Sequence, residues 1–200
     1  MVVNAKTDAL THVGVATVWG LVVMVMIYAV GRVSGAHMNP AVTIAFTALG
    51  KMKPTDMIAY IIAQCSGATV AAFALSAVLG NELGFVGATT SVVATGSALG
   101  IEFMMTAILM FVVMGVSTGA KEESVTAGLA VGSTIAMEAF VAGPLTKASM
   151  NPARSIGPAI AAAAESGALT QLWIYIVAPI AGALCGAFLY MLLQPSRDAN

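Results

Sequence analysis

The tripeptide Asn-Pro-Ala occurs twice in this chain, as Asn39-Pro40-Ala41 and as Asn151-Pro152-Ala153, and each copy opens a short apolar run. The runs extend from Val42 to Leu49 and from Ile156 to Ala164. At about 1.5 Å per residue, each run covers roughly half of a ~30 Å hydrocarbon core. Asn is a preferred N-cap and Pro is preferred at the first helical position, so each copy is predicted to begin a helix.

Two half-length helices that begin with the same motif restrict the architecture strongly. Non-helical backbone at membrane depth is tolerated only where it is buried in protein or lines water. The repeated motif therefore predicts two re-entrant loops whose helix N-termini meet around one aqueous path.

The composition places this path inside a membrane. The 200 residues are 59% hydrophobic and only 8% charged, whereas soluble domains carry about 25% charged residues. We therefore expect an integral, multi-pass membrane protein. The net charge of −1 gives no reason to expect a nucleic-acid partner, and Cys65 and Cys185 are interpreted as small core residues in apolar helices.

Five apolar stretches are long enough to cross a bilayer. They are Leu10–Tyr28, Asp56–Leu79, Ala98–Val116, Val125–Val141 and Leu169–Leu193. The fourth span is expected to stop at Gly143-Pro144, and Lys121-Glu122-Glu123 is interpreted as a charged turn before it. The predicted fold is thus an all-α membrane protein with five full spans and two half-helices.

The basic residues orient these spans. One side collects most of them, namely Arg32, Lys51, Lys53, Lys121 and Arg197, and the positive-inside rule assigns that side to the cytoplasm. The two half-helices then enter from opposite sides, as in an inverted repeat. We expect one domain over residues 1–200, with a first repeat at 1–80 and a second at 97–193. The second motif follows two spans and the first follows only one, so the first repeat is expected to be one helix short and this form less stable than one with that span.

Several polar side chains are candidates for lining or supporting the path. Asn39 and Asn151 are expected to cap their helices through the side-chain oxygen and to present amide donors to the pore. Arg154 lies within one turn of the second motif and is expected to form a constriction that repels cations. Glu102 is expected to accept hydrogen bonds from the second loop as a structural brace, and His37 to make a structural hydrogen bond beside the first.

With both motifs established, the sequence resembles the major intrinsic proteins, the family of aquaporins and aquaglyceroporins. The resemblance rests on Ser34–Thr43 and Ala148–Ser155. The stretches Trp19–Val22 and Ala142–Thr146 are most similar to the plant nodulin-like members and their bacterial relatives. The resemblance covers Val2 to Leu193, and the family's first transmembrane helix has no counterpart in this sequence.

The resemblance implies a four-residue selectivity filter made of Trp19, Ala139, Ala148 and Arg154. Ala139 is smaller than the Val or Ile usual at its position, which implies a wide, half-apolar aperture suited to glycerol as well as water. Ser155 and Ala159 instead match water channels. Lys147 stands where relatives usually have Gly and Glu138 stands beside the filter, so these two side chains either pair or Lys147 reaches the outer water.

We therefore expect a passive channel for water and small uncharged solutes such as glycerol, and not an enzyme. No catalytic set, cofactor motif or metal-ligand cluster is present in the sequence. The resemblance further implies a homotetramer in the plasma (cell inner) membrane. A secondary active transporter with inverted repeats and an incomplete, non-conducting family member are the alternatives.

Overall fold

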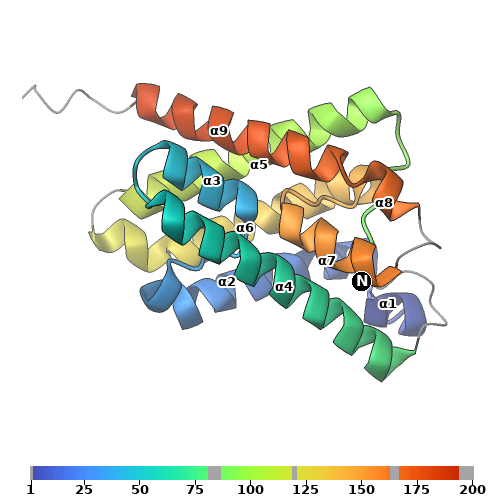
Figure 1. The fold of residues 1–200 in the computed structure, drawn as a ribbon. Helices are drawn as coiled ribbons and strands as arrows, with labels where there is room; N and C mark the ends of the chain where they lie inside the picture. The colour runs from blue at the N-terminus through green and yellow to red at the C-terminus, as the bar shows by residue number, and fades with distance from the viewer. Residues whose placement is uncertain (1, 81–86, 119–120, 163–166, 194–200) are drawn as a thin grey trace, which may run out of the picture.

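The computed structural model describes residues 2–80, 87–118, 121–162 and 167–193, and all secondary structure in these ranges is helical (Figure 1). The helices in chain order are α1 (Val2–Thr7), α2 (His12–Ser34), α3 (Pro40–Ala48), α4 (Pro54–Leu79), α5 (Thr95–Thr118), α6 (Lys121–Thr146), α7 (Pro152–Ala162), α8 (Ala168–Gln171) and α9 (Ile174–Leu193). Within the described ranges, five segments are long and apolar enough to cross a membrane, as predicted from the sequence. The fifth comprises α8 and α9, which a short turn separates.

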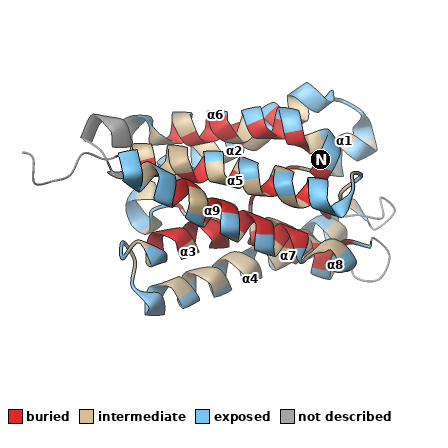
Figure 2. Ribbon diagram, turned by 90° about the horizontal axis from the view of Figure 1, so that it is seen from above, coloured by how far each residue is buried: buried red, intermediate tan, exposed pale blue. Residues whose placement is uncertain are grey.

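The two half-helices enter the bundle from opposite ends. In Figures 1 and 2, both half-helices lie among the long helices, with α3 in the left half of the bundle and α7 in the right half. Among the long helices, α2 packs along α6 and α5 along α9, while α4 packs against α7. The predicted pair of re-entrant half-helices is therefore confirmed.

The Asn-Pro-Ala motifs begin these half-helices by the expected capping. The Asn39 side-chain oxygen accepts a hydrogen bond from the Ala41 amide at 2.9 Å, and Pro40 occupies the first turn of α3. In the second copy, Asn151 Oδ1 accepts from the Ala153 amide at 3.0 Å. Since each side chain satisfies one of the free amides of a helix N-terminus, both helices start at the residue after Asn.

Small residues allow the helices to cross closely. A Cβ atom on Gly182 or Gly186 of α9 would lie 2.3 Å from the Phe103 carbonyl oxygen or 2.1 Å from that of Ala107, both on α5. A Cβ on Gly157 of α7 would lie 2.4 Å from the Ala68 carbonyl carbon of α4. Backbone-to-backbone contact of this kind is the usual way that membrane helices associate.

Two boundaries predicted from the sequence are wrong. Helix α6 begins at Lys121, so the residues expected to form a charged turn start a helix, and it continues past Gly143-Pro144 to Thr146. Pro144 has no N–H to donate to the Phe140 carbonyl. His12 Nε2 lies 3.0 Å from that oxygen instead, and a Cβ on Gly143 would lie 2.7 Å from the His12 ring. Thus His12 replaces the missing bond, and Gly143 leaves room for its ring.

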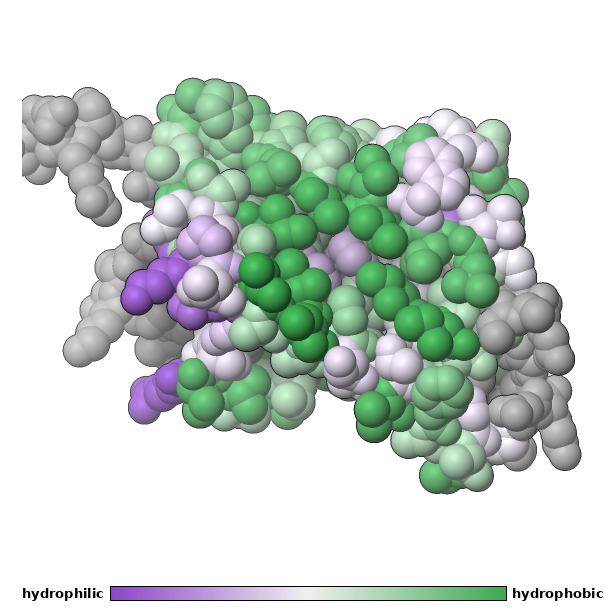
Figure 3. Space-filling model, viewed as in Figure 1, coloured by the Kyte–Doolittle hydropathy of each residue, from purple (hydrophilic) through white to green (hydrophobic). Residues whose placement is uncertain are grey.

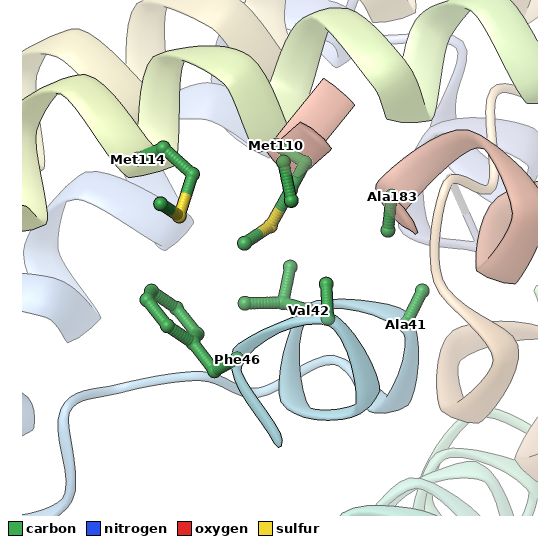
Figure 4. Close-up of a cluster of buried hydrophobic side chains, with 8 residues drawn as sticks. Ala41, Val42, Phe46, Met110, Met114 and Ala183 are labelled. Atoms are coloured by element: carbon green, nitrogen blue, oxygen red, sulfur yellow. The ribbon is translucent and has the colours of Figure 1, made fainter. Parts of the chain in front are cut away.

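Side chains from α5 and α9 bury the inner face of α3. Val42 and Phe46 of α3 face Met110 and Met114 of α5, with Ala183 of α9 beside them (Figure 4). The outer surface is also apolar. Hydrophobic residues cover most of the face in Figure 3, while strongly hydrophilic ones gather at the left end of the bundle. Contact with lipid requires such an apolar surface along the sides of the bundle.

The basic residues used to orient the chain lie at one end where they are described. Arg32 is in the last turn of α2, Lys51 and Lys53 lie between α3 and α4, and Lys121 begins α6. The end of α2, the connection between α3 and α4, and the start of α6 all lie at the left end of the bundle in Figure 1. Arg197 lies outside the described residues.

Candidate conduction pore

A cavity of about 800 Å³ extends through the bundle from Lys51 and Lys53 to Arg154. Both Asn39 and Asn151 line it. Residues of α2, α3, α4, α5 and α6 line the cavity together with the loop after α3 and the loops that precede α3 and α7. The two motifs thus meet at one internal cavity, although 112 positions of sequence separate them.

The two motif asparagines tie the loops to each other. Asn39 Nδ2 donates to the Met150 carbonyl at 2.7 Å, and Asn151 Nδ2 donates to the Met38 carbonyl at 2.8 Å. Each amide group has two N–H bonds, so one joins the two loops and one is left for the cavity. The sequence predicted the donors facing the pore but did not predict this reciprocal tie.

The carbonyl groups that accept these bonds lie on strained backbone. Met38 and Met150 have φ values of 46° and 50°, and Ala36 and Ala148 have φ values of 45° and 46°. The left-handed region costs a non-glycine residue about 1–2 kcal/mol. The same pattern in both loops indicates that strain is retained where carbonyl groups must be presented, as is common at functional sites.

Glu102 connects α5 to the second loop. Its carboxylate is fully buried and accepts hydrogen bonds from the Ser149 amide at 2.9 Å, the Met150 amide at 2.7 Å and the Thr146 hydroxyl at 2.7 Å. The Tyr175 hydroxyl in turn donates to the Thr146 carbonyl at 3.0 Å. These are the contacts that a brace of this loop requires.

His37 supports the first loop on the opposite side. Its Nδ1 lies 3.2 Å from the Thr43 hydroxyl oxygen, and its ring stacks on Phe46 with centroids 4.8 Å apart. Gln64 Nε2 donates to the same Thr43 oxygen at 3.0 Å. His37 therefore has a structural hydrogen bond, although it also lines the cavity.

Arg154 is fixed at one end of the cavity by the segment before α5. Its Nη1 donates to the Gly87 carbonyl at 3.2 Å and to the Thr89 hydroxyl. The guanidinium carbon lies over the Trp19 ring, 5.1 Å from its centroid. This distance is within the range of a cation–π contact, so the two side chains touch each other instead of facing across an open gap.

The likeness of this arrangement to known proteins is extensive. The family model described as "Major intrinsic protein" matches residues 1–190. The chain belongs to the major intrinsic protein family. An "Aquaporin NIP1-2" of Oryza sativa subsp. japonica is 44% identical over 99% of this chain and 68% of its own length. An "Aquaporin NIP1-1" of Zea mays is 46% identical over 96% of this chain and 67% of its own length.

The fold also matches that of a solved structure. The structure titled as the aquaglyceroporin from Plasmodium falciparum superimposes with a TM-score of 0.80, covering 96% of this chain and 87% of that one. The sequence identity is 23%, so this likeness concerns the fold. The resemblance to major intrinsic proteins that the motifs predicted is thus confirmed.

The remaining filter residues predicted for this family member are small and line the same cavity. Ala139 of α6 and Ala148 of the second loop are buried, and the half-buried Trp19 and Arg154 line the same cavity. Since Trp19 and Arg154 touch, a solute either passes beside them along the alanine wall or separates them. Their role as a filter remains a prediction.

Lys147 and Glu138 do not pair. Neither carboxylate oxygen of Glu138 has a hydrogen-bond partner in the described part of the chain. Lys147 has a left-handed φ of 66°, a conformation that glycine adopts without strain. This explains physically why Gly suits the position and Lys strains it.

Three supporting residues of this pore were not identified from the sequence. Thr89 and Gly87 hold Arg154, and Thr146 donates to Glu102. The only sequence signal for the first two is a Gly/Ser/Thr-rich loop, which has no periodicity to relate it to Arg154. The same loop contains Asn81 and Glu82, which lie outside the described residues.

Proposed function

We propose that this protein is a passive transmembrane channel for water and small uncharged solutes such as glycerol. The observation that carries the proposal is the single cavity that both motif asparagines and all four predicted filter residues line. Two relatives are named aquaporins, and the matching structure is titled an aquaglyceroporin. Family membership implies a channel and not an enzyme.

The geometry of the cavity supports the exclusion of cations and protons. The N-termini of α3 and α7 carry partial positive charge, and Asn39 and Asn151, which precede them, line the cavity. Arg154 adds a full positive charge at its outer part. A cation or proton entering this region meets repulsion from both sources, whereas a water molecule exchanges hydrogen bonds with the free N–H bonds of Asn39 and Asn151.

The wall chemistry supports passage of a small polyol. Ala139 and Ala148 provide width and apolar surface, and Trp19 provides a flat ring for a carbon backbone. Arg154 provides hydrogen-bond donors for the hydroxyl oxygens of the solute in the same part of the cavity. A linear polyol needs both kinds of wall, because an unpaired buried polar group costs about 1–3 kcal/mol.

The alternative of a secondary active transporter requires an ion-coupling carboxylate at the midplane of the membrane, where Glu102 and Glu138 are the candidate side chains. Glu102 is engaged by the second loop, and Glu138 does not line the cavity. These contacts favour a channel. The incomplete, non-conducting family member is the remaining alternative, and only a flux measurement separates it from a channel.

Further proposals concern assembly and location. The chain forms one channel domain over residues 1–200, with repeats at 1–80 and 97–193. It assembles as a homotetramer in which each subunit has its own pore. It is inserted in the plasma (cell inner) membrane, with the end that carries Lys51 and Lys53 in the cytoplasm.

Stopped-flow measurements on proteoliposomes test the function. Vesicles with the protein should shrink and reswell faster than empty vesicles in gradients of glycerol and of urea, and water flux should depend only weakly on temperature. Flux should follow the solute gradient and ignore imposed sodium or proton gradients. Permeabilities equal to those of empty vesicles would support the non-conducting alternative, and coupling to an ion gradient would support a transporter.

A further inference from the structure

Glu138 is a second fully buried carboxyl group in the membrane-spanning part of the bundle, and its environment is unlike that of Glu102. It lies on α6 directly before the filter residue Ala139 but is not among the residues that line the cavity. Its relative exposure is 0%, and neither Oε1 nor Oε2 has a hydrogen-bond partner among the described residues. A native side chain in this condition requires an explanation.

Glu102 and Glu138 differ in the hydrogen-bond donors that surround their carboxyl groups. Glu102 accepts from two backbone amides and from the Thr146 hydroxyl. Such donors stabilise a carboxylate anion. Glu138 accepts no such hydrogen bond among the described residues.

The charged and titratable groups around Glu138 do not supply a counter-charge either. On α5 the charged group that interacts with Glu138 is Glu102, which has the same sign. On α2, His12 faces the Phe140 carbonyl. Beyond α6, Arg154 is bound to Gly87 and Thr89 and lies over a ring.

The other titratable side chains near α6 are also oriented elsewhere. The Tyr28 hydroxyl of α2 accepts from the Leu129 amide, and the Tyr175 hydroxyl of α9 donates to Thr146. Lys147 makes no hydrogen bond to Glu138. No group of three His, Cys, Asp or Glu side chains in the described ranges could hold a metal ion there.

We propose that Glu138 is a proton-binding site, occupied at neutral pH, and that its proton allows α6 to pack against α5 behind the filter. An uncompensated charge in a membrane interior is costly, and the group becomes neutral instead. The proton removes both that cost and the repulsion from Glu102. This site is distinct from the conduction pathway and does not depend on which solute the channel passes.

The occupied site makes the packing of α6 sensitive to alkaline pH. Loss of the proton creates a second negative charge near that of Glu102, without a donor to receive it. We expect the filter-bearing part of α6 to lose its packing when this occurs. The Glu138→Gln variant keeps the size and neutrality of the side chain and has no proton to lose.

Infrared spectroscopy of the purified protein in lipid at neutral pH tests the site directly. The wild type should show the carbonyl stretching band of a protonated carboxyl group, and Glu138→Gln should lose it. Glu102→Gln is the matched control, because it makes the same chemical change on a carboxyl group with three donors. That variant should keep the protonated band and should lower the melting temperature, since it weakens the acceptor for two buried amides.

A second measurement tests whether loss of the proton from Glu138 lowers the stability of the protein. The melting temperature of the wild type should fall as the pH is raised from neutral to alkaline, and that of Glu138→Gln should fall less. The proposal is overturned if the wild type lacks the protonated band, if Glu102→Gln removes it, or if both proteins lose stability equally. Failure of Glu138→Gln to fold would also overturn it, because the amide is the neutral isostere of the proposed state.

Discussion

At the residue scale, Arg154 shows how this fold keeps a charge inside a membrane protein. The guanidinium donates to Gly87 and Thr89 and rests on the Trp19 ring. A buried charge is tolerated when its donors are satisfied and its position is fixed. Its field therefore stays at one place along the cavity.

Replacement of Arg154 by Ala should weaken exclusion of cations or protons while the flux of neutral solutes persists. The substitution removes the fixed charge at the predicted constriction and leaves the rest of the wall in place. A pH-sensitive dye inside proteoliposomes measures the proton leak. Arg32→Ala, which removes an arginine at the end of α2 that does not line the cavity, is the control and should not raise the leak. An unchanged leak in Arg154→Ala would argue against the filter assignment.

Replacement of Ala139 by His should reduce glycerol flux by about tenfold and retain water flux. The imidazole narrows the alanine wall and adds a polar group that the glycerol carbons must face, at a cost of about 1–3 kcal/mol. Reswelling rates in a glycerol gradient give the permeability. Ala139→Val adds bulk without polarity and should reduce glycerol flux less. Undiminished glycerol flux through the His variant would mean that Ala139 does not limit passage.

At the element scale, the half-helices are held by contacts that the two repeats share. The Tyr60 hydroxyl of α4 donates to the Ser34 carbonyl at 2.9 Å, as the Tyr175 hydroxyl of α9 does to the Thr146 carbonyl at 3.0 Å. Each long helix thus ties down the start of the loop that precedes a half-helix. The contacts made by glycine differ between the repeats, and this difference can be tested.

Gly157→Ala should destabilise the protein, and Gly67→Ala should not. The new Cβ at residue 157 would lie 2.4 Å from backbone of α4, whereas nothing lies within 4 Å of one at residue 67. Overpacking costs about 1–3 kcal/mol, while Ala in an unobstructed helix position gains about 0.5–1 kcal/mol over Gly. Melting temperatures in one detergent give the comparison. Equal values for the two variants would mean that α7 moves away from α4 at little cost.

At the scale of the whole molecule, the helices differ in how much they face outward. In the most apolar 18-residue stretch of each helix, only 6% of the residues of α4 and 11% of those of α2 are buried. The corresponding share for α6 is 39%. Much of α4 and α2 is therefore available to lipid or to neighbouring subunits. The outward faces carry large apolar side chains such as Ile62, Val70 and Val22.

We expect native mass spectrometry of the protein in mild detergent to detect a complex of four subunits. The expectation rests on family membership, and the exposed apolar faces give such an assembly surface to bury. The Ala139→His variant should have the same mass, since residue 139 faces the cavity and not the exterior. A monomer at all protein concentrations would contradict the proposed tetramer.

The sequence by itself determined the membrane class, the five spans, the starts of both half-helices and the candidate pore residues. These follow from properties that act over a few positions: apolar length, capping by Asn and Pro, and the charge of a loop. The repeat added the inverted architecture, because two matching motifs imply two matching environments. Glu102 was also recognisable, since an ionisable residue in a membrane helix is costly and indicates a structural or functional role.

Only the tertiary structure decided which groups meet. The tie from Asn39 to Met150 spans 111 positions, the bond from His12 to Phe140 spans 128, and the bond from Arg154 to Thr89 spans 65. Such pairs depend on how helices cross, and no local pattern encodes the crossing. For this reason only the tertiary structure shows that His12 supports α6 beyond Pro144 and that Glu138 has no hydrogen-bond partner among the described residues.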